Sequence, residues 1–207
     1  NGVRFHNGRP LNVEDISWSF ERTLTPENRS ERSWVLAPIR GSAATLAGKA
    51  THLEGLESPD DSTLIIRLDK PFAPFLSYLS MECARVAARE GVWGDDFTPI
   101  GTGPYRFVEW NHDIRVRLEA FKDYHGEKAH IERVDFEVVP ENGVALMKTV
   151  VGELDLVNET PAGQLALIKK KYGGYVRLWP YLRIEYIGFN LTKPPFRDNL
   201  KLRQAFA

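Results

Sequence analysis

The 207-residue sequence contains a single cysteine, Cys83, and no long apolar run. One cysteine excludes a disulfide within the chain and any zinc site built on several cysteines. No stretch approaches the ~20 apolar residues that a membrane-spanning helix needs. Blocks of one charge sign are also missing, because 27 Lys and Arg nearly balance 28 Asp and Glu, for a net charge of −1. We therefore expect no binding to nucleic acid or to an anionic membrane surface.

Sequence motifs for catalysis are scarce as well. No serine lies in a nucleophile-elbow motif, and no neighbour of Cys83 in the sequence would activate its thiol. The adjacent carboxylates Asp60-Asp61 and Asp95-Asp96 lie in turn-like segments without the separation that glycosidases require. Gly101-Thr102-Gly103 is followed by a predicted strand and not by the lysine and helix of a phosphate loop. We expect neither an enzyme nor a bound cofactor.

The first 120 residues follow patterns typical of an α+β unit rich in hairpins. Asn12 is a helix-capping residue, the apolar stripe from Val13 to Leu24 has helical spacing, and Pro26 ends it. Alternating segments on either side of Asp-, Ser- and Pro-rich turns are typical of hairpins. The expected elements are a strand at residues 3–5, a helix at 13–24, a hairpin of 53–57 with 63–68, a helix at 74–80 and a hairpin of 105–110 with 114–119.

Residues 99–105 (PIGTGPY) predict a tight turn that leads into a strand. Gly101 and Gly103 supply backbone angles that other residues reach only with strain, and Pro104 fixes the direction in which the chain leaves. A Gly/Pro run of this kind is a weak signal by itself. It becomes more informative when it is considered together with the other motifs along the chain.

From residue 121 onwards, strand and helix patterns alternate and favour a layered α/β arrangement. The chain starts at Asn1 without an initiator methionine and ends within a predicted helix at 199–207, so we expect a fragment of a longer protein. The expected elements of this region are strands at 134–138, 154–157, 175–179 and 183–190, and helices at 143–151 and 161–171.

Motifs spread over nearly the whole chain agree in order and approximate spacing with one known family. They resemble the extracellular solute-binding proteins of family 5, which serve peptide-type ABC importers, and residues 75–90 are most similar to the dipeptide and oligopeptide binders. The residues that carry this resemblance are 3–11 (VRFHNGRPL) with Asp15, Ser17, Ser19 and Arg22, then 99–105 (PIGTGPY), 121–126 (FKDYHG), 152–155 (GELD), 188–190 (GFN), 194–198 (PPFRD) and 203–205 (RQA).

The resemblance implies a periplasmic-binding-protein-like fold of type II, peptide-binder class, with mixed α+β and α/β content. Such proteins have two lobes that close on a solute around a hinge. The chain would form lobe I, with residues 1–120 as its appended mixed β subdomain and 121–207 as its α/β part, which ends in a hinge-crossing helix near Asp198. The second lobe would be missing. Half a cleft should bind weakly or not at all, because such proteins bury the solute from both sides.

The function implied by the resemblance is capture of di- or oligopeptides outside the cytoplasmic membrane and delivery to an ABC permease. The protein would be periplasmic or extracellular, with or without a lipid anchor in its full-length form. Alternatives within the family are a nickel-chelate, opine or oligosaccharide binder, and a peptide-sensing regulatory domain on the same fold. An alternative of another class is a zinc-dependent peptidase-like hydrolase that uses His125, Glu127 and His130.

The residues most expected to face the solute lie just before the Gly-Thr-Gly turn. A peptide offers an ammonium and a carboxylate, so Glu82 would pair with a cation and Arg85 with a carboxylate, although surface ion pairs are the alternative. An aromatic surface from Trp110, or from Trp93, would add apolar contact, with core packing as the alternative. The predicted ligand-binding residues are Met81, Glu82, Cys83, Arg85 and Trp110. The scattered His6, His52 and His112 are expected at the surface.

Overall fold

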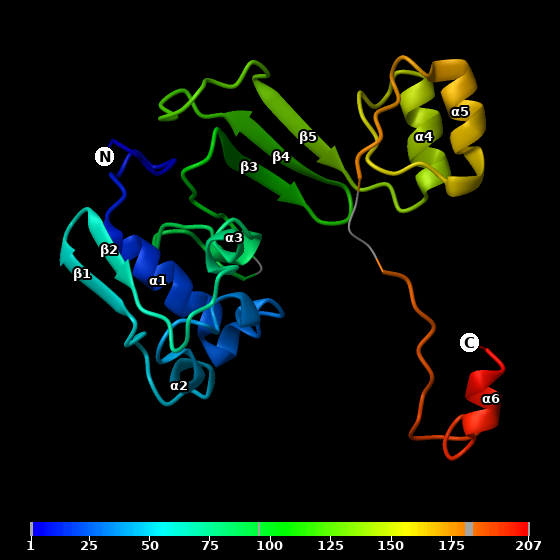
Figure 1. Ribbon diagram of the computed structural model, residues 1–207. Helices are drawn as coiled ribbons and strands as arrows, with labels where there is room; N and C mark the ends of the chain where they lie inside the picture. Colours follow the sequence, from blue (N-terminus) through cyan, green and yellow to red (C-terminus); the bar gives the residue numbers. More distant parts are fainter. Residues whose placement is uncertain (1, 95, 181–183, 207) are drawn as a thin grey trace. The chain divides into compact units, whose positions relative to one another are not determined.

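The computed structural model describes residues 2–94, 96–180 and 184–206 (Figure 1). The chain divides into two compact units, Asn1–Pro140 and Glu141–Ala207, called here the first and the second unit. The boundary near residue 120 implied by the family resemblance separates two parts of one lobe of a longer protein, and it stays a prediction. Among the described residues, no helix has the length and apolar character needed to cross a membrane.

Helix α1 (Val13–Leu24) confirms the prediction made from its capping residues. The side chain of Asn12 accepts a hydrogen bond from the Asp15 backbone N–H at 3.1 Å, and the Asp15 carboxylate accepts one from the Asn12 N–H at 3.0 Å. This reciprocal capping box satisfies two donors that the helix itself leaves unpaired. The apolar stripe then buries Phe20 and Leu24, which are almost fully excluded from solvent.

The core of the first unit packs around α1. Short helices and a hairpin cover the apolar stripe, and each is too short to be stable without this packing. The elements are α2 (Ser42–Leu46), α3 (Phe75–Tyr78), the 3-10 helices η1 (Pro26–Asn28), η2 (Ser33–Val35) and η3 (Glu82–Ala84), and the strands β1 (Leu56–Asp60) and β2 (Thr63–Ile66). The buried cluster consists of Phe20, Leu24, Leu36, Ile39, Leu53, Phe75 and Ala84.

The β1–β2 hairpin is antiparallel, as predicted, but its turn is shorter than the sequence suggests. We predicted a turn over residues 58–62, whereas β1 continues to Asp60, which pairs with Thr63. The reason is local: the Asp60 carboxylate accepts hydrogen bonds from the Ser62 N–H and hydroxyl, both at 2.8 Å, and so closes the turn tightly. Pro59 is accommodated where the register shifts between Glu57 and Asp60.

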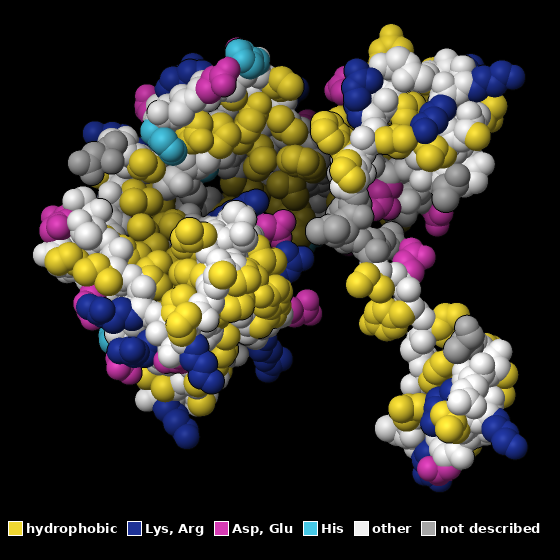
Figure 2. All heavy atoms as spheres, viewed as in Figure 1, with side chains coloured by type: hydrophobic (Ala, Val, Ile, Leu, Met, Phe, Trp, Pro, Cys, Tyr) yellow, Lys and Arg dark blue, Asp and Glu magenta, His cyan; other side chains and the backbone are white. Residues whose placement is uncertain are grey.

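Strands β3 (Tyr105–Asn111), β4 (Arg115–Ala120) and β5 (Arg133–Glu137) form an antiparallel sheet in the order β3-β4-β5. The predicted hairpin is therefore confirmed, and the strand predicted at 134–138 exists but joins this hairpin. One face carries ion pairs such as Arg117–Asp135 at 2.7 Å. The other aligns Trp110, Val116 and Phe136 across the three strands. Figure 2 shows hydrophobic side chains gathered over this sheet.

The second unit is helical in its regular parts. Helices α4 (Asn142–Val150), η4 (Ala162–Gln164), α5 (Leu165–Tyr172) and α6 (Leu200–Gln204) confirm the predicted helices to within a few residues. The strands predicted at 154–157 and 175–179 are not formed, and neither is the described part, 184–190, of the strand predicted at 183–190; Arg183 lies outside the described residues. A strand needs a hydrogen-bonded neighbour, and no described segment of this unit pairs with these residues.

Candidate functional site

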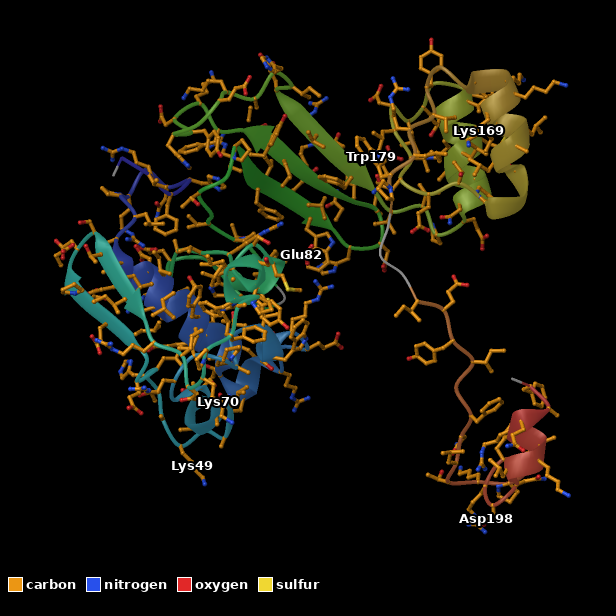
Figure 3. All side chains as sticks on the ribbon, in the orientation of Figure 1. Lys49, Lys70, Glu82, Lys169, Trp179 and Asp198 are labelled. Atoms are coloured by element: carbon orange, nitrogen blue, oxygen red, sulfur yellow. The ribbon has the colours of Figure 1, made fainter. Side chains whose placement is uncertain are left out.

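The predicted site residues from Met81 to Arg85 form η3 and its two ends, directly after α3. Figure 3 shows Glu82 beside α3. Its carboxylate lies 3.2 Å from the Arg32 guanidinium, and the two side chains are 67% and 55% exposed. The structure therefore pairs Glu82 at the surface, which was the alternative to a solute contact. Arg85 is exposed, while Met81 and Cys83 are half-buried. Their roles in solute binding stay predictions.

Helix α1 holds η3 and the residues that follow it by side-chain hydrogen bonds. The Thr23 hydroxyl donates to the Cys83 carbonyl at 3.1 Å. The buried Ser19 hydroxyl accepts from the Ala87 N–H at 3.1 Å. Ser19 and Thr23 are four positions apart on α1 and so lie on one face of the helix. This face fixes the backbone at Cys83 and Ala87, on either side of the predicted site residue Arg85.

Trp110 lies on β3 and is 41% exposed. Its ring packs edge-on against Phe97 at 6.0 Å between centroids, and Phe97 packs in the same way against Trp93 at 5.7 Å. The His112 ring lies 4.0 Å from Trp110 on the neighbouring turn. The two tryptophans that the sequence suggested as alternatives thus belong to one row of aromatic rings, Trp93–Phe97–Trp110.

Arg22 on α1 contacts this aromatic row, and sequence reasoning missed it as a site residue. Its guanidinium carbon lies 3.8 Å from the Trp93 ring centroid, in the last turn of α1. Thr23, the next residue, holds Cys83. The sequence did contain a signal, because Ser19, Arg22 and Thr23 have the spacing of one helix face. It did not contain the contact with Trp93, which is distant along the chain.

The Gly-Thr-Gly turn is held by His6, and this corrects two predictions. Neither Gly101 nor Gly103 has the left-handed backbone that would require glycine. His6 is half-buried: its Nδ1 accepts from the Gly101 N–H at 3.3 Å, and its Nε2 donates to the Gly103 carbonyl at 3.0 Å. The ring also packs edge-on against Phe121 at 5.0 Å. One ring nitrogen accepts and the other donates, so His6 is a neutral imidazole that holds the turn by two hydrogen bonds. We had expected it to be a surface residue.

The protonation state of His6 should therefore control the stability of this turn. Burial lowers the pKa of His6 below its ordinary 6.5; the hydrogen bond to Gly103 opposes this change, and the positive charge of Arg106 adds to it. Because the folded protein binds the proton less readily than the unfolded chain, stability is full above about pH 6.5 and falls as the pH drops towards the lowered value.

Replacement of His6 by phenylalanine is expected to destabilise the first unit by about 2 kcal/mol, since it keeps the ring but removes two hydrogen bonds. It should also abolish the loss of stability just below about pH 6.5. Urea unfolding at several pH values measures both effects. His130→Phe, at an exposed position, is the control and should change little. A variant with unchanged stability and the same pH profile would contradict the role of His6.

The three residues proposed for a zinc-dependent hydrolase do not gather into one cluster. Glu127 and His130 lie 3.6 Å apart, both 89% exposed, while His125 packs against the Tyr124 ring at 4.5 Å. Among the described residues, no group of three His, Cys, Asp or Glu side chains is placed to hold a metal ion. The geometry therefore gives the hydrolase alternative no support.

A hollow of about 720 Å³ lies beside the turn that His6 holds. Its lining includes His6, Arg106, Glu119, Phe121 and Lys122, and it contains none of the predicted site residues. Arg106 and Glu119, which are register partners on β3 and β4, form an ion pair at 3.1 Å in its lining. The lining contains both basic and acidic side chains, so it does not favour a solute of one charge sign.

Comparison with known proteins gives a consistent result over the whole chain. Residues 1–207 match the model of the bacterial extracellular solute-binding proteins, family 5 middle, a family of binding proteins and not of enzymes. The dipeptide-binding protein of Escherichia coli is 28% identical over 99% of the chain, and the glutathione-binding protein of Pectobacterium atrosepticum is 30% identical over 99%. The chain spans only 40% and 38% of these relatives.

Solved structures with the same fold support the predicted fold class. The murein tripeptide binding protein of Escherichia coli superposes with a TM-score of 0.76 over 84% of this chain and 36% of that protein, at 24% identity. The oligopeptide-binding protein OppA of Haemophilus influenzae, in complex with the peptide RPPGFSPFR, gives a TM-score of 0.73 over 82% of this chain and 35% of its own, at 20% identity. The chain thus has the architecture of part of a periplasmic binding protein.

Proposed function

Because the chain belongs to the bacterial extracellular solute-binding proteins of family 5, we propose that it is part of a protein that captures di- or oligopeptides outside the cytoplasmic membrane. That protein would pass the peptide unchanged to the permease of an ABC importer. The observation that carries the proposal is the match of 99% of the chain to relatives named for dipeptide and oligopeptide binding.

The geometry of the candidate site is compatible with a peptide held against one wall of a cleft. Arg85 offers an exposed cation, and Met81 and Cys83 are half-buried beside it. Trp110 adds a partly exposed aromatic ring. Charged and apolar groups close together suit a ligand with charged ends and variable side chains. Each of these residues is at least partly open to solvent, so tight binding would need the remaining part of the full-length protein.

Calorimetric titration of the full-length protein tests this proposal. We expect heat of binding with a pool of di- to pentapeptides, and none with a nickel–histidine chelate. The chain of 207 residues, titrated in parallel, should bind the same peptides far more weakly, because it supplies only one side of the cleft. Heat with the chelate but not with the peptides would overturn the peptide assignment.

A second measurement separates binding from catalysis. The full-length protein is incubated with the bound peptides and with zinc, and the peptides are then examined by mass spectrometry. We expect them to be recovered intact, as required of a protein that hands its solute to a permease. Sustained cleavage that exceeds one turnover per protein would contradict the proposal and favour the hydrolase alternative.

A further inference from the structure

Arg22 differs from the other partly buried arginines of the first unit in its lack of a partner. Arg9, Arg115 and Arg117 each lie 2.7 Å from a carboxylate oxygen, and their side chains are 22–34% exposed. Arg22 is also half-buried, but within residues 2–94, 96–180 and 184–206 its guanidinium has no ion pair and no hydrogen bond. Its contact is the face of Trp93, at 3.8 Å.

The guanidinium nitrogens of Arg22 stay open to solvent, and no described residue offers them an acceptor. The guanidinium carries five N–H donors, and it stays charged because burial lowers its pKa only from a very high ordinary value. Stacking on an indole compensates part of the lost hydration but satisfies none of the donors. Trp93 adds a second unused donor, because its Nε1 is buried and finds no acceptor among the described residues. An accessible guanidinium with no protein acceptor, stacked on an indole, is a group that an anionic ligand can reach.

We propose that Arg22 and Trp93 form a binding site for a carboxylate group of the solute. The inference rests on the proposed function and narrows it to solutes that carry a free carboxylate, such as a peptide with an unmodified C-terminus. A guanidinium binds a carboxylate through two parallel hydrogen bonds. The neighbouring rings of Phe97 and Trp110 continue from Trp93 and offer apolar contact to the adjacent part of the same solute.

Paired ligands test this assignment on the full-length protein. The probes are trialanine with a free C-terminus and its C-terminal amide, titrated into the wild type and into Arg22→Gln. We expect the wild type to prefer the free acid by roughly tenfold or more, and Arg22→Gln to lower the affinity for the acid to that for the amide. The affinity for the amide should stay unchanged. If the preference for the acid survives in Arg22→Gln, or both ligands weaken equally, the proposal is wrong.

Two variants control for effects on folding. Arg89→Gln removes another arginine that lies over a tryptophan of α1, Trp18, at 5.7 Å, and should leave both affinities unchanged. Arg22→Lys keeps the positive charge but not the planar fork, so it should retain only part of the preference for the acid. Circular dichroism confirms that each variant is folded. A loss of preference in Arg89→Gln as large as in Arg22→Gln would also contradict the proposal.

A probe without a peptide separates this proposal from the proposed function. Sodium acetate should raise the thermal midpoint of the wild type relative to sodium chloride at equal ionic strength, and Arg22→Gln should abolish the difference. Asp95 lies two residues after Trp93 in the sequence and outside the described residues, so Asp95→Asn is included. The acetate effect should persist in it. An effect absent in the wild type but gained in Asp95→Asn would show an internal partner and overturn the inference. If peptides fail to bind while the Arg22-dependent acetate effect remains, only the peptide assignment fails.

Discussion

Replacement of Gly55 by alanine is expected to destabilise the first unit by about 3 kcal/mol. A Cβ atom at this position would lie 2.5 Å from the Arg67 carbonyl oxygen and 2.9 Å from the Arg40 nitrogen. Both are backbone atoms, so no side-chain rotation relieves the clash. The three residues also bond to one another: Gly55 N–H to Arg40 O at 3.0 Å, Arg67 N–H to Gly55 O at 2.7 Å, and Arg40 N–H to Arg67 O at 2.9 Å. Each of the three residues takes part in two of these hydrogen bonds, so movement of any one segment would break two of them.

Urea unfolding of Gly55→Ala measures this effect, with Gly103→Ala as the matched control. Gly103 lies in the same unit, lacks the left-handed backbone, and would place its Cβ 4.0 Å from the nearest atom of a non-adjacent residue, the Tyr105 oxygen. Its replacement should change the unfolding free energy by less than about 1 kcal/mol. Equal stability of the two variants would contradict the close approach at Gly55.

Elements that depend on neighbouring residues were predictable from the sequence. Helix α1 begins at Val13 because Asn12 and Asp15 cap it within one turn, and its end is signalled by Pro26. The β3–β4 hairpin follows from the alternation on either side of a short turn. In each case the residues that decide the structure lie within a few positions of one another, so the pattern can be read without knowledge of the fold.

Pairing between distant segments was not predictable in the same way. The alternation around Phe136 indicates a strand with one apolar face, but it does not say that the partner of β5 is β4. The segment at 184–190 has a strand-like pattern, yet no described segment pairs with it. Alternation of apolar and polar residues shows which side chains share a face of a strand, but it does not show which segment pairs with that strand. A strand forms only where such a partner is present.

The candidate site shows the same limit. The sequence placed Cys83 and Trp110 as separate suggestions. It could not show that Arg22 stacks on Trp93 or that Thr23 bonds to Cys83. His6 was misjudged for a related reason. Its partners are backbone atoms of Gly101 and Gly103, which carry no residue-specific signal. A contact between a side chain and distant backbone leaves nothing in the sequence pattern to detect.

Replacement of Asp15 by asparagine is the second change for which we expect a large loss, about 2–3 kcal/mol at about pH 7. Asp15 is only 3% exposed. Its carboxylate accepts two hydrogen bonds from the Arg9 guanidinium, at 2.7 and 2.9 Å, and one from the Asn12 N–H at 3.0 Å. Asparagine keeps the shape but removes the charge, so it leaves Arg9 with Glu90 as its remaining partner, at 2.7 Å.

The pH dependence of this loss identifies its cause. Burial of Asp15 by itself would raise the pKa of its carboxyl group, but the hydrogen bonds from Arg9 and from the Asn12 backbone outweigh it, and the pKa lies below its ordinary 3.8. The unfolded chain therefore takes up the proton first as the pH falls. The stabilisation by Asp15 is full above about pH 4 and is lost as the pH falls through the lowered pKa.

Unfolding by urea at about pH 7 and about pH 3 tests this reasoning, because the difference between the wild type and Asp15→Asn should shrink in acid. Glu57→Gln is the matched control. Glu57 pairs with Arg67 at nearly the same distances, 2.7 and 2.8 Å, but both side chains are about half exposed, so solvent screens the pair and its removal should have a much smaller effect. Equal losses in the two variants, or a difference for Asp15→Asn that persists unchanged in acid, would show that burial of the charged pair is not what stabilises the start of α1.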